Sequence, residues 1–274
     1  MAVNVGMAPS PARASGLKAR IVSALLMAPV ALAAVWFGSP WIEVLTIVAA
    51  GIMAWEWTRL CGAGSFGATG VLIVATVILA VVLGAARANG LALAVAVAGS
   101  GLVLGIGLGR REPAPNLTAI GVLWLAVPCI ALLWLAREMG TGAIFWILAV
   151  VWATDIGAYA VGRTVGGPKL APRISPGKTW SGLFGGMACA ALAGFITARI
   201  AGTPPWSLVL LSAALAVVGQ AGDLAESSLK RRFGAKDASG LIPGHGGLLD
   251  RLDALLAVVA TVAVLRLAGV VSLR

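Results

Sequence analysis

The sequence predicts an all-α polytopic membrane protein with about nine transmembrane helices and a polar site, in the C-terminal half, that faces the cytoplasm. Hydrophobic residues make up 60% of its 274 residues and charged residues 11%, with a mean hydropathy of +1.00. A soluble domain carries about 25% charged residues, so this composition argues against a soluble enzyme and against a nucleic-acid binder. The net charge of +10 fits basic loops beside anionic lipid headgroups.

Nine apolar runs predict the transmembrane helices, since about 20 residues cross a ~30 Å hydrocarbon core. The runs are continuous rather than alternating, which argues against a transmembrane β-barrel. The first run follows basic residues, as in a signal peptide. Because it is longer than a signal sequence and further runs follow, we expect a retained helix. The predicted spans are residues 21–37, 41–59, 69–86, 90–109, 118–136, 142–162, 181–200, 206–223 and 252–271.

The basic residues predict the orientation. With the N-terminus inside and nine crossings, 5 of the 20 Lys and Arg residues lie outside and 20 − 5 = 15 lie on the cytoplasmic side. Cytoplasmic loops of membrane proteins are enriched in Lys and Arg, so this orientation is favoured over the reverse. We therefore expect a multi-pass protein of the cell inner (plasma) membrane with its C-terminus outside.

Polar chemistry is concentrated in the second half, where all the aspartates and the only histidine, His245, lie. In the first half, Glu56 lies three residues before Arg59, and this spacing predicts an intrahelical ion pair, with a catalytic role for Glu56 as the alternative. The asymmetry predicts a helical scaffold followed by a functional module. The expected parts are a cytoplasmic tail at 1–20, a transmembrane scaffold at 21–141 and a transmembrane catalytic module at 142–274.

Asp155 lies inside a predicted span, seven residues before Gly162 at its end. An aspartate inside a bilayer costs about 2–3 kcal/mol, so its side chain is expected to face protein or a wet cavity. Two interpretations remain open. Asp155 is either a functional carboxylate or a buried polar group bonded to a neighbouring helix.

Residues 162–182 are rich in glycine and proline and carry four basic residues. Such a stretch cannot be a continuous helix, and its cations and free backbone N–H groups suit phosphate. A plain basic cytoplasmic loop is the alternative. Residues 172–179, PRISPGKT, look like a Walker A loop, but Pro172 replaces its first glycine and no strand precedes it, so a P-loop is excluded.

The most informative stretch is residues 219–254. Asp223, Glu226, Ser227 and Lys230 have the spacing of one helix face. A glycine-rich turn follows. Asp250 and Asp253 come next, and their i, i+3 spacing alone would indicate a helix-capping pair. Their convergence with the turn and with several cations favours a functional site. Oxygen ligands without clustered Cys or His favour a hard cation such as Mg²⁺ over zinc.

At these residues the chain resembles a known family. Residues 227–253, SSLKRRFGAKDASGLIPGHGGLLDRLD, are similar to the signature of the phosphatidate cytidylyltransferases (CDP-diglyceride synthases) at every fixed position. ATDIGAY at 153–159, SPGKT at 175–179 and QAGDL at 220–224 agree with it. The resemblance implies Mg²⁺-dependent transfer of CMP from CTP to phosphatidate, which gives CDP-diacylglycerol and pyrophosphate.

The resemblance also implies roles for individual residues. The expected metal ligands are Asp223 and Asp250, with Asp253 binding a second cation or holding the other ligands. The expected catalytic residues are Asp223, Asp250, Lys230, Lys236 and Arg251. The expected substrate-binding residues are Asp155, Ser175, Lys178, Thr179, Ser227, Arg231, His245, Gly246 and Gly247.

The expected partners are CTP, phosphatidate and membrane lipid, without nucleic acid, and the small-residue helix faces would suit a homodimer. The lipid tails should stay in the bilayer, so a groove open sideways near the inner leaflet is expected. One alternative is a CTP-dependent polyprenol kinase, against which the complete signature argues. The other is an ion-coupled transporter, which predicts carboxylates near the midplane and two related halves. Here the charges lie near the cytoplasmic ends of the spans and the two halves differ.

Overall fold

The computed structural model describes residues 16–62, 66–242, 244 and 246–271, with the backbone only for residues 16–24. These residues form nine helices and one two-stranded sheet, so each predicted span is confirmed as a helix. The helices are α1 (Gly16–Phe37), α2 (Trp41–Cys61), α3 (Ala68–Ala85), α4 (Asn89–Gly109), α5 (Pro115–Glu138), α6 (Thr141–Thr164), α7 (Trp180–Ala201), α8 (Pro205–Arg232) and α9 (Leu249–Leu267).

Seven of these helices, α2 to α8, are long and apolar enough within the described residues to cross a membrane. Helix α9 (19 residues) differs from them because it carries more charge for its length, with Asp250, Arg251, Asp253 and Arg266. Helix α8 runs past the predicted end of its span, residue 223, and continues to Arg232. The polar face that begins at Asp223 is therefore carried on a continuous helix.

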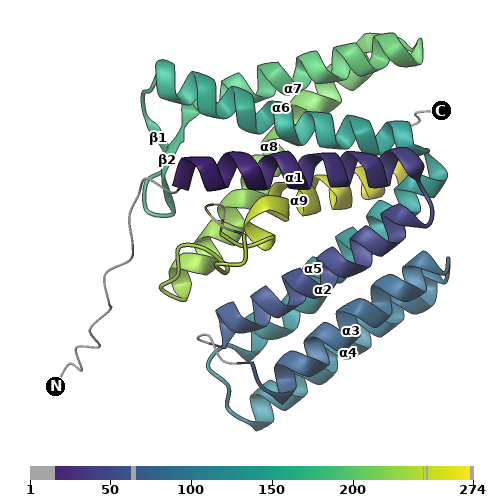
Figure 1. Ribbon diagram of the computed structural model, residues 1–274, viewed down its shortest axis with the longest axis vertical. Coiled ribbons are helices and arrows are strands. Elements are labelled where there is room, and N and C mark those ends of the chain that lie inside the picture. Colours follow the sequence, from purple (N-terminus) through teal and green to yellow (C-terminus); the bar gives the residue numbers. More distant parts are fainter. Residues whose placement is uncertain (1–15, 63–65, 243, 245, 272–274) are drawn as a thin grey trace.

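Helices α2 to α5 pack together as one group, and α6, α7 and α8 pack in sequence as another (Figure 1). Helix α9 contacts α8 and α6 in the second group and α5 and α2 in the first. The last helix therefore connects the two groups, and the residues at its start lie between the halves of the chain.

The stretch 162–182 contains an unexpected β-hairpin, and its first strand shows that the expectation of no strand before residues 172–179 is wrong. Strands β1 (Lys169–Ala171) and β2 (Ser175–Thr179) pair antiparallel, with Lys169 opposite Thr179 and Ala171 opposite Ser175. Thr179 then caps α7, since its Oγ1 accepts a hydrogen bond from the Gly182 N–H at 3.0 Å. Pairing and capping fix the basic stretch to the start of α7.

Glycines allow α6 and α7 to pack closely. A Cβ at Gly185 would lie 2.5 Å from Val161 Cβ, and one at Gly157 would lie 2.7 Å from the Gly185 carbonyl oxygen. Small residues at transmembrane interfaces permit such close approach of backbones. The seam holds the part of α6 that carries Asp155 against the helix that follows the hairpin.

Replacing Gly185 with leucine is expected to destabilise the protein by about 1–3 kcal/mol, because the new side chain must separate α6 from α7. The thermal unfolding midpoint in detergent measures this effect. Gly101→Leu is the matched control, since a Cβ at Gly101 meets no atom within 4 Å. Equal midpoints for the two variants would contradict the close packing of this seam.

Candidate active site

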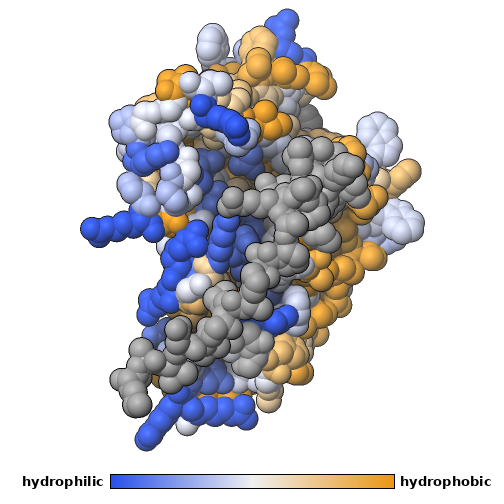
Figure 2. All heavy atoms as spheres, turned by 60° about the vertical axis from the view of Figure 1, so that its left-hand side comes forward, coloured by the Kyte–Doolittle hydropathy of each residue, from blue (hydrophilic) through white to orange (hydrophobic). Residues whose placement is uncertain are grey.

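A cavity of about 580 Å³ lies where α6, the β1–β2 hairpin, the start of α7 and α8 meet. Five residues that the sequence singled out line it together: Asp155, Ser175, Lys178, Thr179 and Asp223. Figure 2 shows hydrophilic side chains gathered at this end of the molecule, beside a largely hydrophobic face. The cavity therefore lies at a polar end of an otherwise apolar bundle.

The wall formed by the hairpin and the end of α6 is basic. Arg163, Lys169 and Lys178 all line the cavity. Lys178 Nζ lies 2.6 Å from Asp223 Oδ2, an ion pair without the alignment of a hydrogen bond. The start of α7 lies in the same wall, and helix N-termini attract anions. This wall suits a polyphosphate.

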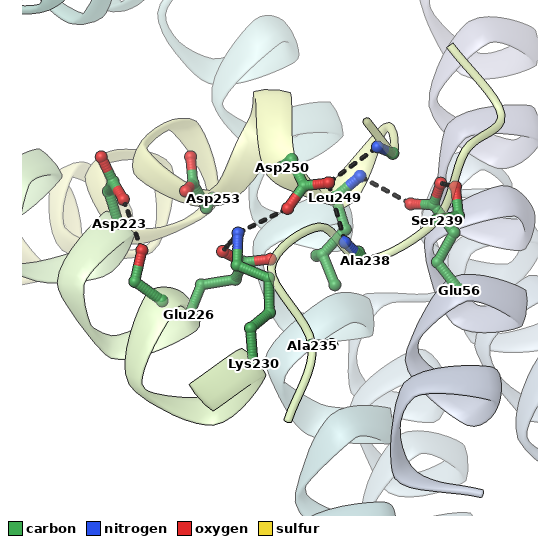
Figure 3. A network of polar contacts seen from close by, with 12 residues as sticks. Glu56, Asp223, Glu226, Lys230, Ala235, Ala238, Ser239, Leu249, Asp250 and Asp253 are labelled. Atoms are coloured by element: carbon green, nitrogen blue, oxygen red, sulfur yellow. Dashed lines mark hydrogen bonds and ion pairs between the residues drawn. The ribbon is translucent and has the colours of Figure 1, made fainter. Parts of the chain in front are cut away.

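Three aspartates from three helices interact with one another, and two of them, Asp155 and Asp223, line the cavity. Asp155 on α6 and Asp253 on α9 each interact electrostatically with Asp223 on α8. Figure 3 shows the side chains of Asp223 and Asp253 pointing in the same direction. Ser227 Oγ donates to Asp223 Oδ1 at 3.2 Å, which orients that carboxylate.

A second polar cluster joins α8 to the start of α9 (Figure 3). Lys230 Nζ forms ion pairs with Glu226 and with Asp250 Oδ1, the latter at 2.5 Å. Asp250 Oδ2 accepts hydrogen bonds from Ala238 N at 2.9 Å and Gly247 N at 2.7 Å. The Lys230 and Asp250 side chains are 9% and 4% exposed. Both residues therefore fix the loop between α8 and α9.

The glycines of this loop lie against carboxylates. Gly246 has φ +82°, and a Cβ there would lie 2.7 Å from Asp250 Oδ2. A Cβ at Gly247 would lie 2.5 Å from Glu56 Oε1. This close packing accounts for both glycines, and their contact with substrate stays a prediction. The prediction for His245 lies outside the described residues.

The remaining predicted cations lie at the edge of the site. Arg231 donates to the Ile174 carbonyl at 3.3 Å and to the Ala235 carbonyl at 3.2 Å, and so joins the hairpin to the α8–α9 loop. Lys236 is exposed on that loop and is not among the cavity-lining residues. Arg251, which is exposed in the first turn of α9, interacts electrostatically with Asp155. Their roles toward substrate stay predictions.

Sequence reasoning missed the role of Glu56. The expected ion pair between Glu56 and Arg59 is wrong. The Glu56 carboxylate instead accepts hydrogen bonds from Ser239 Oγ, Leu248 N and Leu249 N. Arg59 stacks over the Trp55 ring at 5.0 Å. The available signal was the rarity of a carboxylate inside an apolar span, which by itself suggests a functional site.

The donor set fits a hard cation that is completed by substrate. Within the described residues, no three Asp, Glu, His or Cys side chains are grouped so that they could hold a metal by themselves. Mg²⁺ is commonly bound through one or two carboxylates plus substrate phosphates. Asp223, which lines the cavity, and its neighbour Asp253 supply two such carboxylates.

Comparison with known proteins agrees with the site. The cytidylyltransferase family pattern matches residues 18–268. A phosphatidate cytidylyltransferase of Brucella suis is 39% identical over 252 residues, which cover 90% of this chain and 92% of the relative. One of Pseudomonas aeruginosa is 37% identical over 261 residues, 91% of this chain and 96% of the relative. One of Mycobacterium leprae is 48% identical over 118 residues, 43% of this chain and 38% of the relative. The first two matches span both the basic cavity and the α8–α9 loop, and the chain therefore belongs to the cytidylyltransferase family.

Proposed function

We propose that this protein is a Mg²⁺-dependent phosphatidate cytidylyltransferase, which transfers CMP from CTP to phosphatidate and releases pyrophosphate. The observation that carries the proposal is the Lys178–Asp223 ion pair in a basic cavity at the polar end of a membrane bundle. The pair places a cation suited to phosphate beside a carboxylate suited to a divalent metal. Relatives that share most of the chain's length have this activity in their names.

The reaction needs positioning more than proton transfer. A phosphate oxygen of phosphatidate attacks the α-phosphorus of CTP, and the bond from that phosphorus to the oxygen that bridges the α- and β-phosphates breaks. That oxygen leaves as a terminal oxygen of pyrophosphate. The attacking oxygen is already anionic, so a general base is not required. Two polyanions must be brought together, and this suits Arg163, Lys169 and Lys178 around one cavity. Positioning and charge neutralisation supply most of the rate in such transfers.

Asp223 and Asp253 would hold Mg²⁺, with Asp155 adding negative charge beside them. The ion would neutralise charge that develops on the CTP phosphates. The ligand role of Asp250, implied by the family resemblance, stays a prediction. Asp250 is the weaker candidate because its oxygens already accept bonds from Lys230, Ala238 and Gly247.

We place the cavity on the cytoplasmic side of the inner membrane, where CTP is available. The excess of basic residues on that side supports this orientation. The lipid substrate would enter sideways from the inner leaflet, so that its acyl chains stay in the bilayer. A homodimer through small-residue helix faces stays a prediction.

The test uses purified protein in mixed micelles with phosphatidate and CTP, with and without Mg²⁺, and follows pyrophosphate and the mass of the lipid product. CDP-diacylglycerol and pyrophosphate should appear together, and only with the divalent metal. If CDP and a phosphorylated lipid appear once polyprenol is supplied, the protein is a polyprenol kinase. Folded protein that converts no lipid would contradict the proposal and favour a transporter.

A further inference from the structure

Glu56 links the N-terminal half of the chain to the signature loop. Its side chain is fully buried, at 0% exposure. Oε1 accepts hydrogen bonds from Ser239 Oγ at 2.6 Å and Leu248 N at 2.9 Å, and Oε2 accepts one from Leu249 N at 2.7 Å. These donors lie 183 to 193 residues away in the sequence. Figure 3 shows Glu56 on α2 reaching the start of α9.

The contact supplies what the start of α9 lacks. The first N–H groups of a helix have no partner within the helix, and Leu248, at the N-cap position, has no side-chain acceptor. The Glu56 carboxylate accepts from two of these N–H groups, at the end of the helix dipole that favours negative charge. A buried carboxylate is costly unless it is well hydrogen-bonded, and bonds to a charged acceptor are strong. The buried Glu56 carboxylate therefore binds the start of α9 and does not form a solvent-facing ion pair.

Two carboxylates hold this turn from opposite directions. Asp250 accepts from Gly247 N, and Glu56 accepts from the next two amides, Leu248 N and Leu249 N. Gly247 brings the backbone close enough because it has no Cβ. Asp253 follows four residues after Leu249, about 6 Å along the helix. The position of the helix start therefore sets where Asp253 lies relative to Asp223.

We propose that Glu56 is a positioning residue for the transfer reaction: it fixes the start of α9 and thereby places Asp253 beside Asp223. The proposal rests on the proposed function, and it gives the N-terminal half a direct part in the site. A shift of about 1 Å in catalytic groups can cost about 100-fold in rate. The helix start therefore has to be fixed as firmly as the cavity wall.

Glu56→Gln tests the contact with almost no change of shape. The amide keeps one oxygen acceptor, but its NH₂ group must then face either the Leu249 N–H or both the Leu248 N–H and the Ser239 hydroxyl. We expect kcat to fall by about 10- to 100-fold and the Mg²⁺ concentration for half-maximal rate to rise. The KM for CTP should change little, since the cavity-lining cations are untouched.

Two further variants test whether the effect of Glu56→Gln is specific to this contact. Glu43→Gln is the matched control, because it makes the same change in the first turn of α2, about 20 Å from Glu56 along the helix. It should match the wild type. Ser239→Ala removes one of the three donors and should reduce kcat by a smaller factor of about 3 to 10. If Glu56→Gln does not fold, Ser239→Ala decides, and wild-type kcat and Mg²⁺ dependence in that variant would overturn the proposal.

Hydrogen exchange gives a readout that does not depend on activity. Amides of residues 246–254 should exchange faster in Glu56→Gln than in the wild type or in Glu43→Gln. A lower thermal midpoint with unchanged kcat, Mg²⁺ dependence and exchange would make Glu56 a general packing residue and overturn the proposal. Wild-type protein without transferase activity would contradict the proposed function instead. In that case, faster exchange in Glu56→Gln still supports the positioning contact and unchanged exchange overturns it.

Discussion

Replacing Asp223 with asparagine should reduce kcat by about 10²–10³-fold, the usual cost of removing one group that stabilises charge in the transition state. Asparagine keeps the size and one oxygen of the side chain but loses its charge. The Asp223 carboxylate pairs with Lys178 Nζ at 2.6 Å and lines the cavity. It is one of the two carboxylates that we propose bind Mg²⁺. The rate of CDP-diacylglycerol formation, measured across a Mg²⁺ titration, should show both a lower maximum and a weaker response to the metal.

Glu138→Gln serves as the control for loss of one negative charge. It lies exposed at the end of α5 and is not among the cavity-lining residues. Its rate and Mg²⁺ dependence should equal those of the wild type. An Asp223→Asn protein with near-normal kcat and an unchanged Mg²⁺ requirement would remove Asp223 from the proposed metal site.

The parts of the fold that follow from local sequence were predictable. Each apolar run is long enough to form its own helix, so nine helices could be placed without knowing their neighbours. The face that carries Asp223, Glu226 and Lys230 follows from helical spacing alone. The β-hairpin was not predictable, since strands as short as Lys169–Ala171 leave no alternating pattern among glycines and prolines.

The parts of the site that depend on tertiary contacts were not predictable. Local spacing favoured Arg59 as the partner of Glu56, whereas its partners lie on the α8–α9 loop and at the start of α9. Asp250 and Lys230 are 20 residues apart, and only the loop between them brings the two charges together. The signature identified which residues matter, but the contacts decide which of them face the cavity and which hold the loop.

The family signature implies that Lys230 acts on substrate, whereas its contacts in the structure hold the α8–α9 loop. Lys230→Met should distinguish these two roles. If Lys230 acted on substrate, as its expected catalytic role implies, its loss would raise the KM for CTP and leave stability unchanged. In the structure it pairs with both Glu226 and Asp250, whose side chains are 0% and 4% exposed. Removing one partner of a buried ion pair costs about 3–5 kcal/mol, because the remaining charge is left uncompensated. We therefore expect a marked loss of thermal stability in detergent.

A second substitution shows whether this loss comes from uncompensated charge. Glu226→Gln added to Lys230→Met removes one of the two buried carboxylates that have lost their cation. The double variant should therefore regain part of the thermal stability, whereas Glu43→Gln added to Lys230→Met should regain none. Full stability of Lys230→Met with a raised KM for CTP would contradict the anchoring role and return Lys230 to the substrate. The result that we expect, a loss of thermal stability in Lys230→Met, would mean that Lys230 acts through Asp250, by holding the loop that precedes α9.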